Sequence, residues 1–149
     1  SVYLFLKKEY EKGNIENNPL FQFILRSYYR LDNAGLGDEI KKEYFKILEE
    51  KESDLKTILS RLHKVKNLRG LNTIQFSFAT KLLHTLNNNN PIFDSEVSDV
   101  IHKKQAGITK EEKIRSCLGI YEYLKCLYSN LLKYDEIMRV IINLRKIFK

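Results

Sequence analysis

The sequence predicts an all-α protein of about eight helices that forms a single domain over residues 1–149. Apolar residues recur with helical spacing in almost every segment, and almost no segment alternates as a strand would. Residue types that begin and end helices stand between these segments. The 149 residues include only two prolines and six glycines, which leaves little room for linkers. The chain begins with Ser1 rather than Met, which leaves open that it is a fragment of a longer one.

The first three helices are predicted from their boundary residues. The first covers about 2–12 and ends at Gly13, a residue type favoured just after a helix. The second begins near Pro19, because proline suits the first helical position and Asn18 suits the cap before it. Its stretch LFQFILRSYYRL is apolar almost all round, which is typical of a central helix. Asp38 is the expected cap of the third helix.

The later helices are predicted from the same kind of signal. Ser53 is the expected cap of the fourth helix, and NLRGLNT after it has the composition of a short turn. TKEE has the form of a capping box, in which two side chains satisfy the first backbone N–H groups of a helix. The remaining helices are expected over about 74–86, in a short segment from Asp94, over 109–132 and over 135–148.

Composition bears on the cellular setting and on the class of partner. No apolar run approaches the ~20 residues that cross a bilayer, so no membrane partner is expected. The N-terminal apolar stretch is too short for a signal peptide. Cys117 and Cys126 are nine residues apart on one predicted helix, so they face opposite ways and cannot bond to each other. Free cysteines favour a reducing cytoplasm, and the net charge of +7 favours an anionic partner.

The positive charge is concentrated in one segment. Residues 55–92 contain no Asp or Glu. A field of one sign attracts polyanions such as nucleic acids, although a solvated face that happens to lack acids has the same pattern. The six lysines and arginines of this acid-free segment are Lys56, Arg61, Lys64, Lys66, Arg69 and Lys81.

A turn followed by a helix can hold a phosphate on the free backbone N–H groups of the helix. Small polar residues follow the basic turn, and Asp94 begins the next helix. We expect Asp94 to share one groove with the acid-free segment, either as a helix cap or as a catalytic acid. The residues expected to contact nucleic acid are Lys64, Lys66, Arg69, Asn72, Thr73, Gln75, Ser77 and Lys81.

The segments LNTIQFSFATKLLHTL and PIFDSEV resemble the helix-hairpin-helix DNA glycosylase superfamily, particularly its 8-oxoguanine-glycosylase-like branch. The resemblance covers about 68–101. Residues 71–75 match the hairpin, Ala79 matches a small helix residue, and Pro91 and Asp94 match a proline-and-aspartate segment. It implies a helix-hairpin-helix bundle, DNA as the partner, and base excision by Asp94 without a cofactor or metal.

The sequence departs from the family pattern at two places. Thr73 and Gln75 replace the hairpin glycines, and an alternative register uses Gly70 instead. Ser77 stands where bifunctional members carry a nucleophilic lysine, so the resemblance implies at most a monofunctional DNA N-glycosylase. There a carboxylate beside C1′ of the sugar stabilises the developing cation or activates a water.

Base excision also requires that the target base is flipped out of the duplex, which takes an aromatic or apolar wedge. Phe76, Phe78, Tyr28 and Tyr29 are available for it, although the two tyrosines are more typical of a core. Three functions stay open: a glycosylase, a non-catalytic helical module that binds nucleic acid or protein, and a helical protein with no nucleic-acid partner. The histidines near Asp94 lack metal-ligand spacing, so no metal site is predicted.

Overall fold

The computed structural model describes residues 1–147, with the side chains of residues 33, 34, 141 and 144–147 left out. Within that range the protein is all-helical and has no strand, so the predicted all-α class is confirmed. The seven α-helices and two 3-10 helices (η) are α1 (Val2–Lys12), η1 (Ile15–Asn17), α2 (Pro19–Tyr29), η2 (Leu31–Ala34), α3 (Asp38–Glu49), α4 (Leu55–His63), α5 (Phe76–Leu86), α6 (Ser95–Ile101) and α7 (Lys110–Ile147).

Several predicted helix boundaries are confirmed. α1 ends at Gly13, which takes a φ of 73°. Pro19 is the first residue of α2, and the side chain of Asn18 accepts a 3.0 Å hydrogen bond from the Phe21 N–H. At the start of α7 the capping box forms: the Thr109 hydroxyl accepts from the Glu112 N–H, and the Glu112 carboxylate accepts from the Thr109 N–H.

Two predicted caps are wrong by one residue. Asp38 is the first residue of α3, and Gly37 before it has the extended backbone of a cap. Asp54 rather than Ser53 caps α4, because its carboxylate accepts from both the backbone N–H and the hydroxyl of Thr57, at 2.8 and 2.6 Å. These hydrogen bonds from Thr57 lower the pKa of Asp54.

The predicted break near residues 133–134 is also wrong, because α7 runs through it as one helix. No glycine or proline stands there to interrupt the backbone hydrogen bonds. Just after the expected break, Asp135 and Arg139 form an ion pair of 3.0 Å at the i, i+4 spacing that supports a helix.

The core is one continuous cluster of buried apolar side chains from α1 to the first half of α7. Its largest fully buried members include Phe21 of α2, Tyr44 of α3, Leu62 of α4 and Leu82 of α5. The expectation that α2 is a central helix is wrong, since Phe23 is 59% exposed. α2 therefore covers the core with one face only.

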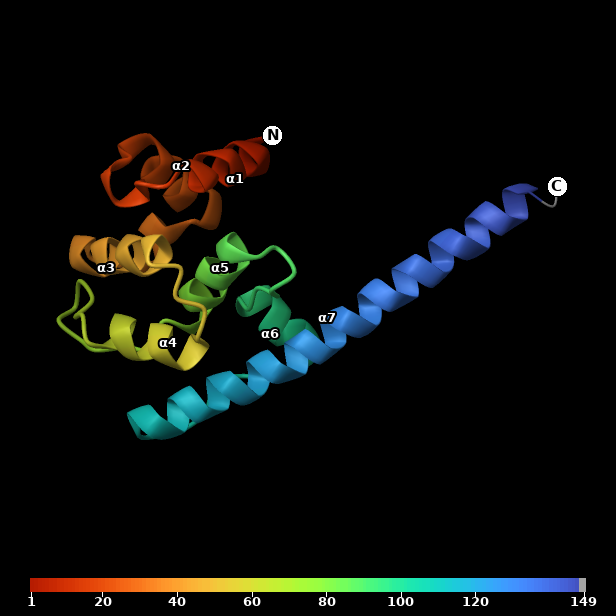
Figure 1. Cartoon of the computed structure of the whole chain (residues 1–149). Coiled ribbons are helices and arrows are strands. Elements are labelled where there is room, and N and C mark those ends of the chain that lie inside the picture. Colours follow the sequence, from red (N-terminus) through yellow and green to blue (C-terminus); the bar gives the residue numbers. More distant parts are fainter. Residues whose placement is uncertain (148–149) are drawn as a thin grey trace.

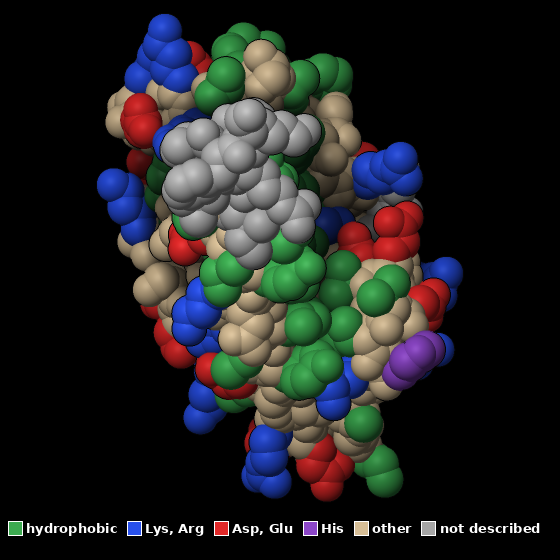
Figure 2. Space-filling view, turned by 90° about the vertical axis from the view of Figure 1, so that its right-hand side faces the viewer, with side chains coloured by type: hydrophobic (Ala, Val, Ile, Leu, Met, Phe, Trp, Pro, Cys, Tyr) green, Lys and Arg blue, Asp and Glu red, His purple; other side chains and the backbone are tan. Residues whose placement is uncertain are grey.

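α7 leaves the body of the protein. In Figure 1 its N-terminal part runs beside α4 and α6, and the rest extends away from every other helix. Its buried residues lie between Ile114 and Leu124. Beyond them Leu131, Tyr134 and Val140 are exposed, and Figure 2, seen from the side toward which the helix points, shows hydrophobic side chains gathered over this half.

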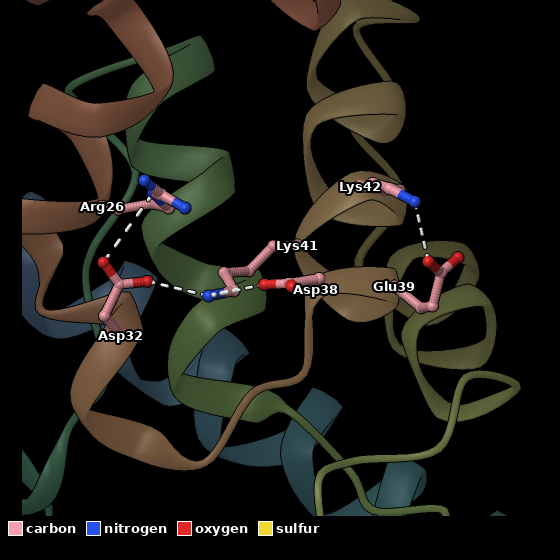
Figure 3. A network of polar contacts seen from close by, with 6 residues as sticks. All are labelled: Arg26, Asp32, Asp38, Glu39, Lys41 and Lys42. Atoms are coloured by element: carbon pink, nitrogen blue, oxygen red, sulfur yellow. Dashed lines mark hydrogen bonds and ion pairs between the residues drawn. The ribbon is translucent and has the colours of Figure 1, made fainter. Parts of the chain in front are cut away.

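A polar network connects the end of α2 to α3 (Figure 3). The Asp32 carboxylate of η2 lies 2.9 Å from the Lys41 ammonium of α3 and 3.8 Å from the Arg26 guanidinium of α2. Lys41 also pairs with Asp38 at 3.3 Å. The hydrogen bond to Asp32 is the main cause that raises the pKa of Lys41. The network holds the chain that continues from Tyr29, which lies in the wall of the candidate site.

Candidate nucleic-acid groove

The connection between α4 and α5 is organised by one asparagine. The Asn67 side-chain oxygen accepts from the N–H groups of Arg69 and Leu71, at 2.9 and 3.1 Å. Gly70 within this turn takes a φ of 72°, the left-handed conformation that glycine adopts at least cost. Thr73 and Gln75 do not have positive φ. The left-handed position therefore falls on Gly70.

This connection is longer than the predicted short turn, since it occupies all of 64–75. After the turn, residues 71–75 carry no regular secondary structure on the way to α5. The Asn72 amide donates to the His63 carbonyl at 2.8 Å, which holds this segment against the end of α4. No side chain caps α5, and the Gln75 amide nitrogen donates to the Thr73 hydroxyl. The first N–H groups of α5 are left without a side-chain acceptor.

Asp94 is positioned by contacts between its own segment and α5. The buried Thr80 hydroxyl accepts a 3.0 Å hydrogen bond from the Phe93 N–H and donates to the Ser77 carbonyl at 2.9 Å. The rings of Phe93 and Phe76 stack with centroids 4.5 Å apart. Asp94 follows directly and caps α6, its Oδ1 accepting from the Val97 N–H at 2.9 Å. The predicted cap is confirmed, and Oδ2 has no hydrogen bond within residues 1–147.

The first of three hollows, which we name the Lys81 hollow, lies between α5, the end of α2 and the start of α6. Its volume is about 740 Å³. It is open to solvent on one side and combines cationic, aromatic and acidic side chains. Its wall consists of Tyr28, Tyr29, Arg30, Ser77, Phe78, Lys81, Ile92, Asp94, Ser95 and Glu96.

Lys81 is the half-buried cation of this hollow. Its ammonium donates to the Tyr29 carbonyl at 3.1 Å and lies 5.0 Å from the centre of the Phe78 ring. Burial lowers the pKa of Lys81, with a smaller contribution from Arg30, while the charge of Asp94 acts in the opposite direction. Lys81 and Asp94 therefore interact electrostatically, although they form no ion pair within 4 Å.

Two smaller hollows continue from the first. The middle hollow, of about 280 Å³, shares Asp94 and Ser77 with the Lys81 hollow and adds Gln75 and Lys104. The third, which we name the His63 hollow, has about 380 Å³ and shares Gln105 with the middle one. Because neighbouring hollows share wall residues, we name the three together the Asp94 groove, in which Asp94 belongs to the first two hollows. The His63 hollow is lined by His63, Asn72, Thr73, Ile74, Gln105, Ile108, Lys110 and Lys113.

The groove contains most, but not all, of the residues that the sequence singled out. The ones in its wall are Asn72, Thr73, Gln75, Ser77, Lys81 and Asp94. Lys64, Lys66 and Arg69 are exposed and contribute to none of its three hollows. The turn and the groove are therefore neighbouring but separate surfaces.

Some positive charges of the acid-free segment are paired, because acidic side chains from other segments contact them. Arg61 forms a 2.7 Å ion pair with Glu43 of α3 and a second ion pair with Glu50. Glu96 stands in the wall of the Lys81 hollow. The absence of acids along the sequence does not make the surface around it acid-free.

Sequence reasoning missed several residues of the groove, and they come from elements distant in the chain. Arg30 follows α2 in a left-handed conformation, with a φ of 54°. Lys104 lies between α6 and α7, and Lys110 and Lys113 lie in the first turn of α7. Nothing in their local sequence marks them. The packing of α7 beside α4 brings Lys110 and Lys113 to the groove.

Of the aromatic side chains considered as a wedge, Phe76, Phe78 and Tyr29 are buried. Tyr28 was expected in the core and is instead 47% exposed at the wall of the Lys81 hollow. Its ring meets the Tyr29 ring edge-on, with centroids 4.9 Å apart. Tyr28 is the aromatic ring that the groove presents to solvent at this point.

The cysteines are free as expected, Cys117 buried and Cys126 exposed. Burial raises the pKa of the Cys117 thiol to about 12, which makes it a poor nucleophile. Within residues 1–147 no three His, Cys, Asp or Glu side chains gather as a metal site would require, and no helix has the length and apolar character to cross a membrane. In comparisons with known proteins, no family model, curated protein or solved structure matches this chain.

Proposed function

We propose that this protein binds DNA along the Asp94 groove and that Asp94 serves there as the acid of a monofunctional N-glycosylase. The observation that supports the proposal best is the position of Asp94, between Lys81 and Arg30 at one end of the groove and Lys110 and Lys113 at the other. In this arrangement lysines and arginines neutralise backbone phosphates, and a carboxylate between them faces the sugar whose bond is cleaved.

The binding step uses charge and polar donors. Lysines and arginines contact phosphates and fix the register of the backbone without reading its sequence. The uncapped N-terminal turn of α5 offers N–H groups beside Ser77, a favourable place for an anion. The resemblance to the helix-hairpin-helix superfamily is a separate support for the proposal, and in this chain the left-handed residue of the connection is Gly70.

The chemical step assigned to Asp94 is hydrolysis of the bond between base and sugar. The bond from C1′ to the base nitrogen breaks, its electron pair leaves with the base, and water supplies the proton that the base takes up. The free Oδ2 of Asp94 stabilises the positive charge that develops at C1′. A water oxygen then bonds to C1′ and gives up a proton to the carboxylate, which passes a proton on to the departed base, so that Asp94 returns to its charged form. Tyr28 is the ring on which the displaced base stacks.

The test uses two variants of the same residue. Asn caps a helix as well as Asp does, so Asp94→Asn removes the charge and keeps α6 intact. We expect wild-type protein to release a base from damaged duplex DNA, and Asp94→Asn to bind the same duplex while releasing less by about 10²-fold or more. Equal release by both proteins would refute the catalytic assignment. Absence of measurable duplex affinity would refute DNA binding itself, and an affinity that does not change with salt would refute the phosphate contacts.

A second candidate is a non-catalytic module that binds nucleic acid along the same groove. The observation in its favour is that Asp94 already has a structural role, since its Oδ1 caps α6. Glu96 in the same hollow adds a negative charge that repels phosphate near the reacting position. This candidate predicts salt-dependent DNA binding with no base release from any substrate.

A further inference from the structure

The His63 hollow at the far end of the groove brings together side chains from three separate parts of the chain. His63 is the last residue of α4, Thr73 belongs to the connection that follows, and Lys110 and Lys113 belong to the first turn of α7. The hollow has a volume of about 380 Å³, which is room for a phosphate group and its remaining water. Of these four residues, only Thr73 was predicted from the sequence to contact nucleic acid.

The chemistry of the wall is that of an anion site. Two lysines and a histidine converge, and no carboxylate contributes to the wall. Neither Lys110 nor Lys113 forms an ion pair with an acid of the described chain. The Thr73 hydroxyl already accepts from the Gln75 amide at 2.6 Å, so its own proton is free to donate into the hollow.

The pKa of His63 depends on this concentration of positive charge. Burial lowers the pKa of His63 first, and the charges of Lys110 and Lys113 lower it further, while Glu111 acts in the opposite direction. All four groups belong to α4 and the start of α7. An anion in the hollow would offset the two lysines and bring the imidazole back toward its protonated form.

We propose that the His63 hollow is a phosphate site, in which Lys110 and Lys113 neutralise the anion and the Thr73 hydroxyl donates a hydrogen bond to it. Its phosphate is one of the DNA backbone, held at a distance along the groove from the nucleotide at Asp94. That the phosphate comes from DNA rests on the proposed function, whereas the ability of the hollow to bind a phosphate does not. His63 gains a proton when the phosphate binds.

The experiment measures His63 by NMR as a function of pH, first without and then with inorganic phosphate. We expect phosphate to raise the pKa of His63, and the rise to disappear in a Lys110→Ala, Lys113→Ala double variant. A Lys64→Ala, Lys66→Ala double variant is the matched control, because it removes the same charge outside the groove. It should keep the rise. A His63 pKa that phosphate leaves unchanged in the wild type would overturn the site.

A second arm uses short duplex DNA and identifies the source of the phosphate. The Lys110→Ala, Lys113→Ala variant should lose about tenfold in affinity, and the slope of log affinity against log salt should become shallower by about 1, the value for one phosphate contact. An unchanged affinity, with the inorganic phosphate effect intact, would overturn the backbone as the source. If the wild type binds no DNA, the proposed function fails, while the inorganic phosphate arm still decides the site.

Discussion

The backbone N–H of Phe93 donates a 3.0 Å hydrogen bond to the buried hydroxyl of Thr80, and this contact determines where Asp94 lies. Thr80 is in the middle of α5, thirteen residues before Phe93 in the chain. The asparagine-rich segment between them is held at its end by His84, whose ring contacts the Asn90 carbonyl at 2.8 Å. A loop of low-complexity sequence therefore ends at a fixed point of the core.

The hydrogen bond between Thr80 and Phe93 predicts a clear cost for its loss. Thr80→Val keeps the shape of the side chain but leaves the buried Phe93 N–H without an acceptor, so it should destabilise the protein by about 1–3 kcal/mol. Thr80→Ser keeps the hydroxyl and serves as the control. Urea denaturation measures both variants, and a Val variant as stable as the Ser variant would show that the hydrogen bond is not required.

Asp94 is predicted to matter to stability as a cap, independently of any chemistry. Asp94→Ala should lower the free energy of unfolding by about 1 kcal/mol, because the Val97 N–H loses its acceptor. Asp94→Asn should leave stability nearly unchanged, because Asn makes the same hydrogen bond. Thermal unfolding by circular dichroism measures both changes. A loss of the same size in the two variants would point to the charge of Asp94 rather than to its cap.

Lys81 is predicted to release its proton at lower pH than the exposed lysines. Because burial lowers its pKa, the unfolded chain holds this proton more tightly, so Lys81 reduces stability at neutral pH and the cost disappears as pH rises toward the ordinary lysine value. NMR titration of the lysine side chains measures the pKa directly. Asp94→Asn should lower it further and Arg30→Gln should raise it. If neither substitution moves it, the three groups do not share one hollow.

The outer half of α7 is predicted to add little to the stability of the body. Its buried residues end at Leu124, and the residues beyond pack against no other described helix. A chain that stops after Lys133 should unfold within about 0.5 kcal/mol of the full chain at low protein concentration. Chemical denaturation of the two chains tests this. A larger loss would mean that the outer half stabilises the folded body.

The parts of the fold that local sequence could predict are those set by local chemistry. Asn18, Asp94 and the Thr109 capping box were predictable because each cap contacts N–H groups only three residues away. The same rule failed by one residue at Ser53, since Asp54 beside it is also a good cap and bonds Thr57 twice. The continuity of α7 was not predicted, although no glycine or proline stands at 133–134 to interrupt the helix.

The site was predictable only in part, because some of its residues come together through packing between distant segments of the chain. Gln75, Ser77 and Asp94 come together because α5 and α6 are neighbours in the chain. Lys110 and Lys113 reach the groove through the packing of α7 beside α4, which no local pattern records. Lys64 and Lys66 have the right charge in the right segment, but they are exposed and lie outside the three hollows.

The central claim is that the groove is one anion-binding surface with Asp94 at its middle. Mapping the amide NMR shifts of the protein as short duplex DNA is added tests this most directly. We predict that Ser77, Asp94, Lys104 and Lys110 shift together and saturate at the same DNA concentration. Shifts confined to the turn around Arg69 or to the outer half of α7, with Asp94 unmoved, would contradict the account.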